Sequence, residues 1–465
     1  MTFMRSGLDR VGVLGVVVSV GVACTPLAGV APTDARVADV VGVRDVDGPR
    51  VCPPPTPGHA SGERDLTLRD LVDPRLADFY IKGAAQDALG RIYAYGAMFG
   101  CHGPGGPTDI AVARFTEDGT LDPSFGVRGI ACTRREAGDT LHSAPFALAV
   151  DDRGRVVAAG LQYINLMDYH PDALVARFDA RGQPDETFGG VGFRRLSIGL
   201  TPGAPRSSSL FVLAEADGFV VAGAERDPFN DGMYDDAYAF VTRLREDGAP
   251  DPSFHGGAAH IDSLSWSFAS VARTPRGYAV AGTSRPGYCP QIVVFGRDGE
   301  RVAGFGTDGV ATHTRCGLQV RGLELDARGG FVMAGATRIT QKTALVRLTS
   351  DGQVDRDFGL DSGLTELDVP WVPGFQLDPV LTRQCDGRLL VVGNAGESGF
   401  TIARLGTDGR PDPLFGTEGF VRVGSVAGSR GLHVYAVLVH PRDGRITVVS
   451  SWNNDRDVAL WRFWP

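Results

Sequence analysis

The chain has 465 residues, a formal net charge of −9 and charged residues at 22% of the sequence. It contains no run of lysine and arginine, which argues against nucleic acid or an anionic membrane surface as a partner, because phosphate binding needs concentrated positive charge. The 63 glycines and the moderate charge are typical of many short strands joined by tight turns.

The N-terminal residues predict export. Arg5 and Arg10 precede an apolar run over 11–23, which is too short to span a bilayer comfortably but suits a secretory signal. The run ends in Gly21–Cys24, which resembles a bacterial lipoprotein box. Lipidation of Cys24 and ordinary secretion both remain open. We expect an outer-membrane or cell-surface lipoprotein, or a secreted or periplasmic protein, and a membrane contact only through a lipid on Cys24.

The sequence divides into three segments. Residues 1–24 are the expected signal peptide. Residues 25–62 contain three consecutive prolines at 53–55 and little periodicity, so we expect a linker. Residues 63–465 are expected to form one domain, and the protein is expected to be a monomer.

A phrase recurs six times along this domain. Strand-like residues run into a turn that ends in glycine, and a phenylalanine follows, usually with glycine after it. The phenylalanines are Phe125, Phe188, Phe254, Phe305, Phe358 and Phe415, so the successive spacings are 63, 66, 51, 53 and 57 residues. Such a period is typical of repeat architectures.

Each unit predicts about four short strands in a meander. In the first unit, an apolar run over 92–96 is followed by alternation over 109–115, a turn at Asp118-Gly119 and a short strand after Phe125. No helical period separates the units. The pattern predicts an all-β fold, a seven-bladed β-propeller of four-stranded blades.

The seventh blade is one strand short in the sequence. It begins at Asp443 and ends with Val458–Phe463. An incomplete last blade would expose an unpaired edge. Asp65–Leu68 resembles Leu364–Leu367, the final strand of unit five. We therefore predict that an N-terminal strand closes the ring by pairing beside the C-terminal strand.

The phrase, as it stands at Ala113–Gly126, resembles the delta-60 repeat of bacterial exported and surface proteins. The resemblance covers roughly residues 80–465 and recurs in all six units. It implies a propeller-like β fold and no defined activity.

An arginine and an aspartate eight residues apart recur in five units: Arg114/Asp122, Arg177/Asp185, Arg243/Asp251, Arg347/Asp355 and Arg404/Asp412. In unit four both are replaced, by Val294 and Val302. The two positions oppose each other across a turn ending in glycine. We interpret them as salt bridges that hold the outer two strands together. The alternative is a ring of arginines lining a ligand channel. Arg462 takes the same position in blade seven without a clear aspartate.

The cysteines other than Cys24 number six, an even count for an exported protein. Cys101 and Cys132 flank the last two strands of unit one, and Cys289 and Cys316 occupy similar places in unit four. We predict a disulfide within each pair. Cys52 and Cys385 are left, and a third disulfide between them is plausible. A zinc site is the rival interpretation, but the cysteine and histidine spacing does not support it.

No linear catalytic signature is present, so no catalytic residue is assigned. The histidines, such as His102, His170, His260 and His313, are interpreted as solvent-facing. The loops that join the second and third strands emerge on one face and carry aromatics beside amides and carboxylates, which suits recognition of a protein, a peptide or a polysaccharide. The candidate binding residues are Tyr163, Asp168, Tyr169, His170, Asp227, Phe229, Asn230, Asp231, Tyr234, Trp452 and Asn453.

One of these loops contains enough oxygen ligands for calcium. The candidates are Asp227, Asn230, Asp231, Asp235 and Asp236. They lack the spacing of an EF-hand loop, so a solvated acidic turn is the preferred interpretation and no cofactor is expected.

Three functions are compatible with this pattern. The favoured one is an exported, non-enzymatic propeller that binds a partner on its loop face. The alternatives are a propeller hydrolase or lyase, of the lactonase or lyase kind, with a site at the channel mouth, and a structural spacer of the cell envelope without a specific ligand. The sequence does not name the ligand or substrate.

Overall fold

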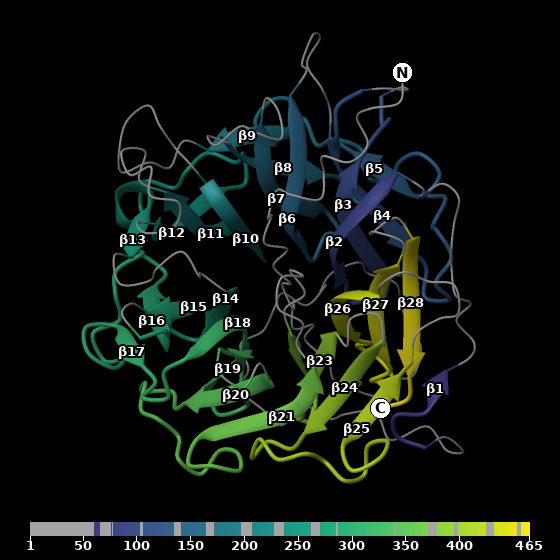
Figure 1. The fold of residues 1–465 in the computed structure, drawn as a ribbon. Helices are drawn as coiled ribbons and strands as arrows, with labels where there is room; N and C mark the ends of the chain where they lie inside the picture. Colours follow the sequence, from purple (N-terminus) through teal and green to yellow (C-terminus); the bar gives the residue numbers. More distant parts are fainter. Residues whose placement is uncertain are drawn as a thin grey trace, which may run out of the picture.

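The computed structural model describes residues 60–65, 76, 78–102, 106–133, 141–163, 172–196, 207–226, 237–261, 270–284, 287–338, 340, 342–370, 379–394, 399–424, 432–452 and 457–465. In this part of the chain, seven four-stranded antiparallel sheets stand around a common centre (Figure 1). The predicted all-β, seven-bladed propeller is confirmed.

The first four blades follow the chain in order. Blade one is β2 (Phe79–Gln86), β3 (Ile92–Met98), β4 (Asp109–Phe115) and β5 (Ile130–Cys132). Blade two is β6 (His142–Val150), β7 (Val156–Tyr163), β8 (Asp172–Phe178) and β9 (Phe193–Leu196). Blade three is β10 (Ser207–Glu215), β11 (Gly218–Arg226), β12 (Ala237–Arg245) and β13 (Ala259–Ile261), with the 3₁₀ turn η3 (His255–Gly257) before β13. Blade four is β14 (Ser270–Thr274), β15 (Gly277–Ser284), β16 (Cys289–Gly296) and β17 (Val310–Thr312).

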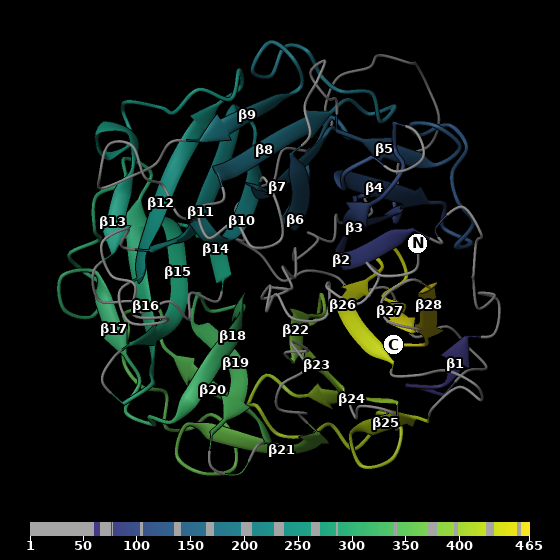
Figure 2. The ribbon, with the colours of Figure 1, turned by 45° about the horizontal axis from the view of Figure 1, so that its top comes forward.

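The last three blades complete the ring. Blade five is β18 (Leu318–Leu325), β19 (Phe331–Thr337), β20 (Lys342–Leu348) and β21 (Leu364–Pro370). Blade six is β22 (Val380–Arg383), β23 (Leu389–Asn394), β24 (Phe400–Leu405) and β25 (Phe420–Val423). Blade seven is β26 (His433–Val439), β27 (Ile446–Trp452), β28 (Asp457–Phe463) and β1 (Arg64–Asp65). The first strand of each blade faces the centre, and the fourth lies at the rim (Figure 2).

The N-terminal strand closes the ring as predicted. β1 pairs antiparallel with β28, with Arg64 opposite Phe463 and Asp65 opposite Arg462. Backbone hydrogen bonds from Gly62 to Trp464 and from Trp464 to Glu63 extend this contact. Blade seven therefore joins the two ends of the described chain.

The core lies between the blades, so strands are apolar on both faces. All seven residues of β4 are buried, and so are all six of β24. Small and β-branched residues such as Ala113 and Val112 let neighbouring sheets approach closely. For this reason the sequences of these strands show little alternation between apolar and polar residues.

The phenylalanine of the repeat phrase is an inter-blade contact. Phe125 is fully buried, and its ring lies 3.0 Å from the point where a side chain on Gly182 of blade two would begin. Gly182 also has φ +78°, a conformation that favours glycine. Gly126 donates a backbone hydrogen bond to Arg181 beside that turn. The phrases of blades two to six thus each carry both a ring and the glycine turn that receives the ring of the preceding blade.

Candidate functional site

The loop residues expected to bind a ligand lie outside the described residues. This holds for Asp168, Tyr169, His170, Asn453 and every candidate between 227 and 236, including the residues considered as calcium ligands. Tyr163 ends β7 and Trp452 ends β27, but the structure describes only their backbone. Cys24, Cys52, the expected signal peptide and nearly all of the expected linker are also outside the described part of the chain.

All five arginine–aspartate pairs are ion pairs. The shortest N–O distances are 2.8 Å for Arg114–Asp122, Arg177–Asp185 and Arg243–Asp251, 2.6 Å for Arg347–Asp355 and 2.9 Å for Arg404–Asp412. The expectation that each pair joins the outer two strands is wrong in one respect. The arginine is on the third strand, but the aspartate precedes the fourth, in the segment after the glycine turn. Blade four keeps the backbone bond of this turn, from Val302 to Val294 at 2.9 Å.

The arginine also reaches the next blade, which the sequence analysis did not anticipate. Arg114 Nη1 donates to the carbonyl of Ala180 at 2.8 Å, and Arg177 Nη1 donates to that of Glu246 at 2.6 Å. In the last blade, Arg462 Nη2 donates to the carbonyl of Glu117 at 2.5 Å. One guanidinium therefore holds its own blade and the following blade together.

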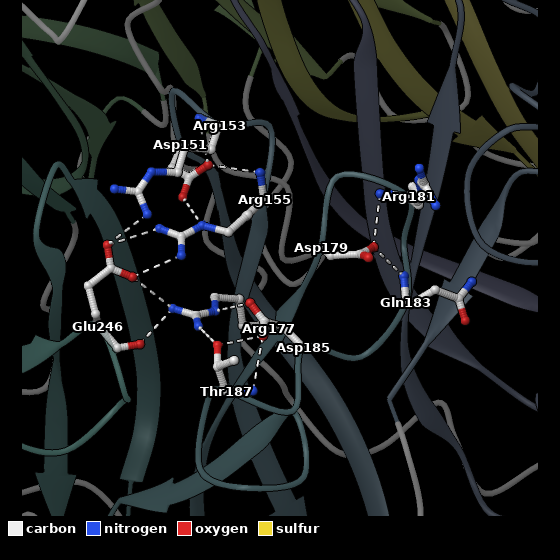
Figure 3. Close-up of polar contacts among 10 residues, drawn as sticks. All are labelled: Asp151, Arg153, Arg155, Arg177, Asp179, Arg181, Gln183, Asp185, Thr187 and Glu246. Carbon is white, nitrogen blue, oxygen red and sulfur yellow. Dashed lines mark hydrogen bonds and ion pairs between the residues drawn. The ribbon is translucent and has the colours of Figure 1, made fainter.

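The junction between blades two and three is the most highly charged of these contacts (Figure 3). The Glu246 carboxylate accepts from Arg155 Nη1 at 2.9 Å and Nη2 at 3.1 Å, and from Arg177 Nη1 at 3.2 Å. Arg153 Nη1 lies 3.6 Å from the same carboxylate. Hydrogen bonds from Arg155 hold the pKa of Glu246 below its usual range, against the opposing effect of burial.

The paired aspartates are held in their ionised form. Burial alone would raise the pKa of Asp185, but hydrogen bonds from Thr187 and the charge of Arg177 outweigh it, so the pKa lies below its usual range. The pKa of Asp122 is lowered in the same way, by Ser124 and Arg114 against burial. These two aspartates are therefore charged in neutral solution.

Two predicted disulfides are confirmed. Cys101 is bonded to Cys132 and Cys289 to Cys316. Cys385 is also disulfide-bonded, while Cys52, its expected partner, lies outside the described residues. Disulfides persist in oxidising compartments, so these bonds are typical of an exported protein. Within the described residues, no helix has the length and apolar character needed to cross a membrane.

A group of three side chains at the junction of blades seven and one has donor types that could hold a metal. Atoms of Glu117, His440 and Asp443 lie within 4.8 Å of one another. Arg445 already contacts both carboxylates, at 3.2 Å from Glu117 and 2.7 Å from Asp443. This guanidinium supplies the positive charge that a cation would bring, so the group is better explained as a polar bridge that closes the ring.

The interpretation of the histidines as solvent-facing is wrong for two of them. His313 is completely buried, and desolvation followed by the charge of Arg315 lowers its pKa to about 4. His440 is also buried, with Nδ1 2.8 Å from Asp443. The sequence gives no signal for either burial, because both histidines stand where chain turns would ordinarily be exposed.

A cavity of about 420 Å³ lies between the outer parts of blades three and four. Five ionisable residues line it. His255 and His260 come from blade three, and Glu300, Arg301 and Asp308 come from blade four. His255 Nδ1 lies 2.8 Å from Glu300 Oε1. The two side chains belong to different blades, and both line the cavity, so the contact joins the two blades there.

His255 occupies a position that is glycine in the other five phrases. It has φ +43°, in the left-handed region, and a side chain in that region costs about 1 kcal/mol or more relative to glycine. Its backbone nitrogen still donates to Asp298 at 2.8 Å, as Gly126 does to Arg181. The repeat geometry therefore does not require histidine here. The signal for this residue stands in the sequence, because Phe254 alone among the six phenylalanines is not followed by glycine.

Comparison with known proteins agrees with the fold. Residues 90–125 and 384–415 match a family described as a domain of unknown function (DUF5122) beta-propeller. Both matched segments end at or near the phenylalanine of a phrase, in units one and six. No curated protein matches the chain.

Solved structures that resemble this one include three carbohydrate-active enzymes. The α-L-arabinofuranosidase Arb93A of Fusarium graminearum has 7% identity and a TM-score of 0.39, over 87% of this chain and 97% of its own. The α-L-arabinanase of Penicillium chrysogenum has 10% identity and a TM-score of 0.38, over 87% and 97%. The NanB sialidase of Streptococcus pneumoniae has 9% identity and a TM-score of 0.40, over 87% and 70%.

These comparisons correct one expectation. The sequence favoured a non-enzymatic binding module, whereas the three structures named above are an arabinofuranosidase, an arabinanase and a sialidase, and the binding-module interpretation is not retained. At these identities the likeness concerns the fold and assigns neither substrate nor catalytic residues. From its seven blades and its matched repeats, the chain is a β-propeller protein.

Proposed function

We propose that this propeller is a hydrolase whose attacking water is activated by His255 in the cavity between blades three and four. The observation that carries the proposal is the His255–Glu300 contact at 2.8 Å, made by a residue in a backbone conformation that disfavours it. Strained residues of this kind cluster at functional sites. The proposed site is at the rim, away from the channel mouth that the sequence suggested.

The chemistry follows from the pair. A proton on His255 Nδ1 donates to Glu300, which leaves Nε2 as the basic nitrogen. Nε2 has no hydrogen-bond partner among the described residues, so it is free to accept a proton from water. The resulting hydroxide would attack a carbonyl carbon, and Arg301, which lines the same cavity, would stabilise the oxyanion. The histidine would then return the proton to the leaving alkoxide. We therefore infer a carboxylic ester or lactone as the substrate class.

Glycoside hydrolysis is the second candidate, because Glu300 and Asp308 both line the cavity. Two carboxylates at one cavity are what most glycosidases use, one as acid and one as base or nucleophile. In this case His255 would only orient Glu300.

The purified protein can be assayed with 4-nitrophenyl acetate, a simple lactone and a panel of 4-nitrophenyl glycosides. His255→Gly restores the residue of the other phrases, so it should fold with a stability within about 1 kcal/mol of the wild type. For an esterase or lactonase, His255→Gly should lower kcat/KM by about 100-fold or more, and Asp308→Asn should have little effect. For a glycosidase, Asp308→Asn and Glu300→Gln should both abolish activity. Full activity in folded His255→Gly and Glu300→Gln would place any hydrolysis elsewhere.

We also propose that the protein is an exported one of the delta-60 repeat kind, with its N-terminal signal removed. The recurring phrase and the two disulfides support this. Metabolic labelling with an alkyne fatty acid would distinguish the two export routes. If the protein is a lipoprotein, the wild type is labelled and the Cys24→Ala variant is not. If the protein is secreted, neither the wild type nor the variant is labelled.

A further inference from the structure

The position of Glu246 recurs once in each unit, and its side chain differs from unit to unit. Glu246 stands two residues before the turn glycine of its unit. The residues at the same position in the other units are Glu117, Ala180, Arg297, Ser350 and Thr407. At four junctions the backbone carbonyl at this position accepts from an arginine of the preceding blade: Arg462 to Glu117, Arg114 to Ala180, Arg177 to Glu246 and Arg347 to Thr407. These four junctions are built alike, so their side chains can be compared directly.

At two of these junctions the position carries a carboxylate that binds a second arginine. Glu246 accepts both terminal nitrogens of Arg155 at 2.9 and 3.1 Å (Figure 3). Glu117 lies 3.2 Å from Arg445 Nη2. Arg155 and Arg445 both follow the glycine in the turn between the first two strands of their blades. At both junctions a carboxylate of one blade therefore pairs with this arginine of the preceding blade, so a carboxylate fits the position opposite the arginine.

The junction of blades one and two has the arginine but not the carboxylate. Arg91 is held as Arg155 is, with Nε 2.7 Å from Asp87 Oδ2 against 2.6 Å from Asp151 Oδ2. The residue that faces it is Ala180. Arg91 Nη2 and the Cβ of Ala180 each lie 3.6 Å from the point where a Cβ on Gly154 would stand. The two groups therefore approach each other across the junction.

The terminal nitrogens of Arg91 have no acceptor among the described residues, and its side chain is 28% exposed. Leu89, 51% exposed, stands two residues before Arg91, as Arg153 stands before Arg155. Arg153 Nη1 lies 3.6 Å from the Glu246 carboxylate, so at the equivalent position of this junction a ligand would meet an apolar side chain in place of a third cation. A ligand here would meet a two-nitrogen fork next to hydrocarbon.

We propose that the Arg91–Ala180 junction binds a carboxylate from solution, in the place that the Glu246 side chain takes at the next junction. The ligand class is a small carboxylate with an aliphatic carbon beside the acid group, which would lie against Leu89. Its source is a free organic acid or the uronic acid of a glycan. The proposal is independent of the hydrolase assigned to blades three and four, because it concerns a different junction.

Thermal unfolding with sodium butyrate, sodium galacturonate or sodium chloride at equal ionic strength tests the site. Each carboxylate that binds should raise the wild-type midpoint by about 1–2 °C at about 100 mM, while chloride should not. A response to butyrate alone indicates a free organic acid, and a larger response to galacturonate indicates a glycan.

Two variants locate the effect. Ala180→Glu supplies from the chain the carboxylate that Glu246 supplies at the next junction, so its midpoint should be higher without ligand and should no longer respond. Arg91→Gln removes the guanidinium and should abolish the rise in midpoint on adding a carboxylate. This result does not depend on whether the glutamate of Ala180→Glu fits the junction. An equal rise in wild type and Arg91→Gln would place the carboxylate elsewhere and overturn the proposal. The absence of any rise in the wild type would overturn it as well.

Discussion

Arg177 contacts two blades with one side chain. Its Nε pairs with Asp185 at 2.8 Å within blade two, and its Nη1 donates to the backbone of Glu246 in blade three at 2.6 Å. The guanidinium also lies over the ring of Phe188, with its centre 4.9 Å from the centroid. Because the Arg177 side chain is almost completely buried, removing it leaves the half-buried carboxylate of Asp185 with donors from Thr187 alone and takes a donor from the Glu246 carbonyl.

Arg177→Ala should therefore lower the free energy of unfolding by about 3 kcal/mol, as breaking a buried ion pair does. Chemical denaturation monitored by circular dichroism measures this loss. Arg181→Ala, an exposed arginine on the nearby turn, is the matched control and should have almost no effect. The double variant Arg177→Val/Asp185→Val imitates Val294 and Val302 of blade four and should recover part of the loss. An unchanged stability in Arg177→Ala would show that the pair is dispensable.

His313 predicts a specific dependence of stability on pH. Its pKa falls from the usual value near 6.5 in the unfolded chain to about 4 in the fold. The folded state therefore binds fewer protons than the unfolded state between these values. The stabilising contribution is complete above about pH 6.5 and is lost as pH falls toward 4, with an upper bound of about 3 kcal/mol.

The position of His313 in unit four is occupied by Thr133 in unit one, so His313→Thr introduces a residue that the repeat already accommodates there. The variant should lose less stability than the wild type between pH 6.5 and 4. Denaturation midpoints measured across this range test the expectation, and parallel curves for the two proteins would contradict it.

At the scale of elements, β1 completes a blade with only two residues. It pairs with β28, and Ser61, just before it, accepts a backbone hydrogen bond from Gly416 at 3.0 Å. Gly416 makes the contact that Gly126 and its equivalents make with the next blade. The N-terminal segment thus supplies for blade six the turn that blade seven does not provide.

Deletion of residues up to 65 should therefore affect two blades, because it exposes the edge of β28 and leaves the turn of blade six without its partner. We expect the midpoint of thermal unfolding to fall by several degrees and association between molecules to increase through the exposed edge. Scanning calorimetry and light scattering measure these effects. A truncation that stops at residue 59 also removes Cys52 but keeps the contact, so it is the matched control, and its unfolding midpoint should be higher than that of the longer deletion.

For the whole molecule, the charge pairs repeat around the ring, and three of them contain an aspartate whose pKa is shifted in the same direction. The pKa values of Asp122, Asp185 and Asp251 are all lowered in the fold. Their contributions are therefore present above the unfolded pKa near 4 and are lost as pH falls through the folded values. We expect cooperative acid unfolding below about pH 4. A variant with Val at both positions of one pair should show a shallower loss, and an identical acid transition would contradict this origin.

The fold could be predicted from the sequence because each blade is specified locally. The period of the phenylalanines, the turn glycines and the eight-residue spacing of Arg114 and Asp122 all lie within one unit. The contacts between blades join residues about 60 positions apart, such as Arg114 and Ala180, and a single sequence does not display that pairing. The cavity was missed for the same reason, since His255 and Glu300 belong to different blades. Only the replacement of glycine by His255 was visible beforehand.

The closing contact has a mechanical consequence. β1 and β28 are antiparallel and share two residue pairs, and β1 lies at the rim of the ring (Figure 1). A pulling force applied at residue 60 acts first on these two pairs, while every other blade is a continuous stretch of chain. Tension would therefore detach β1 before it disturbs the six remaining sheets, so the strand is the point at which the ring yields under load.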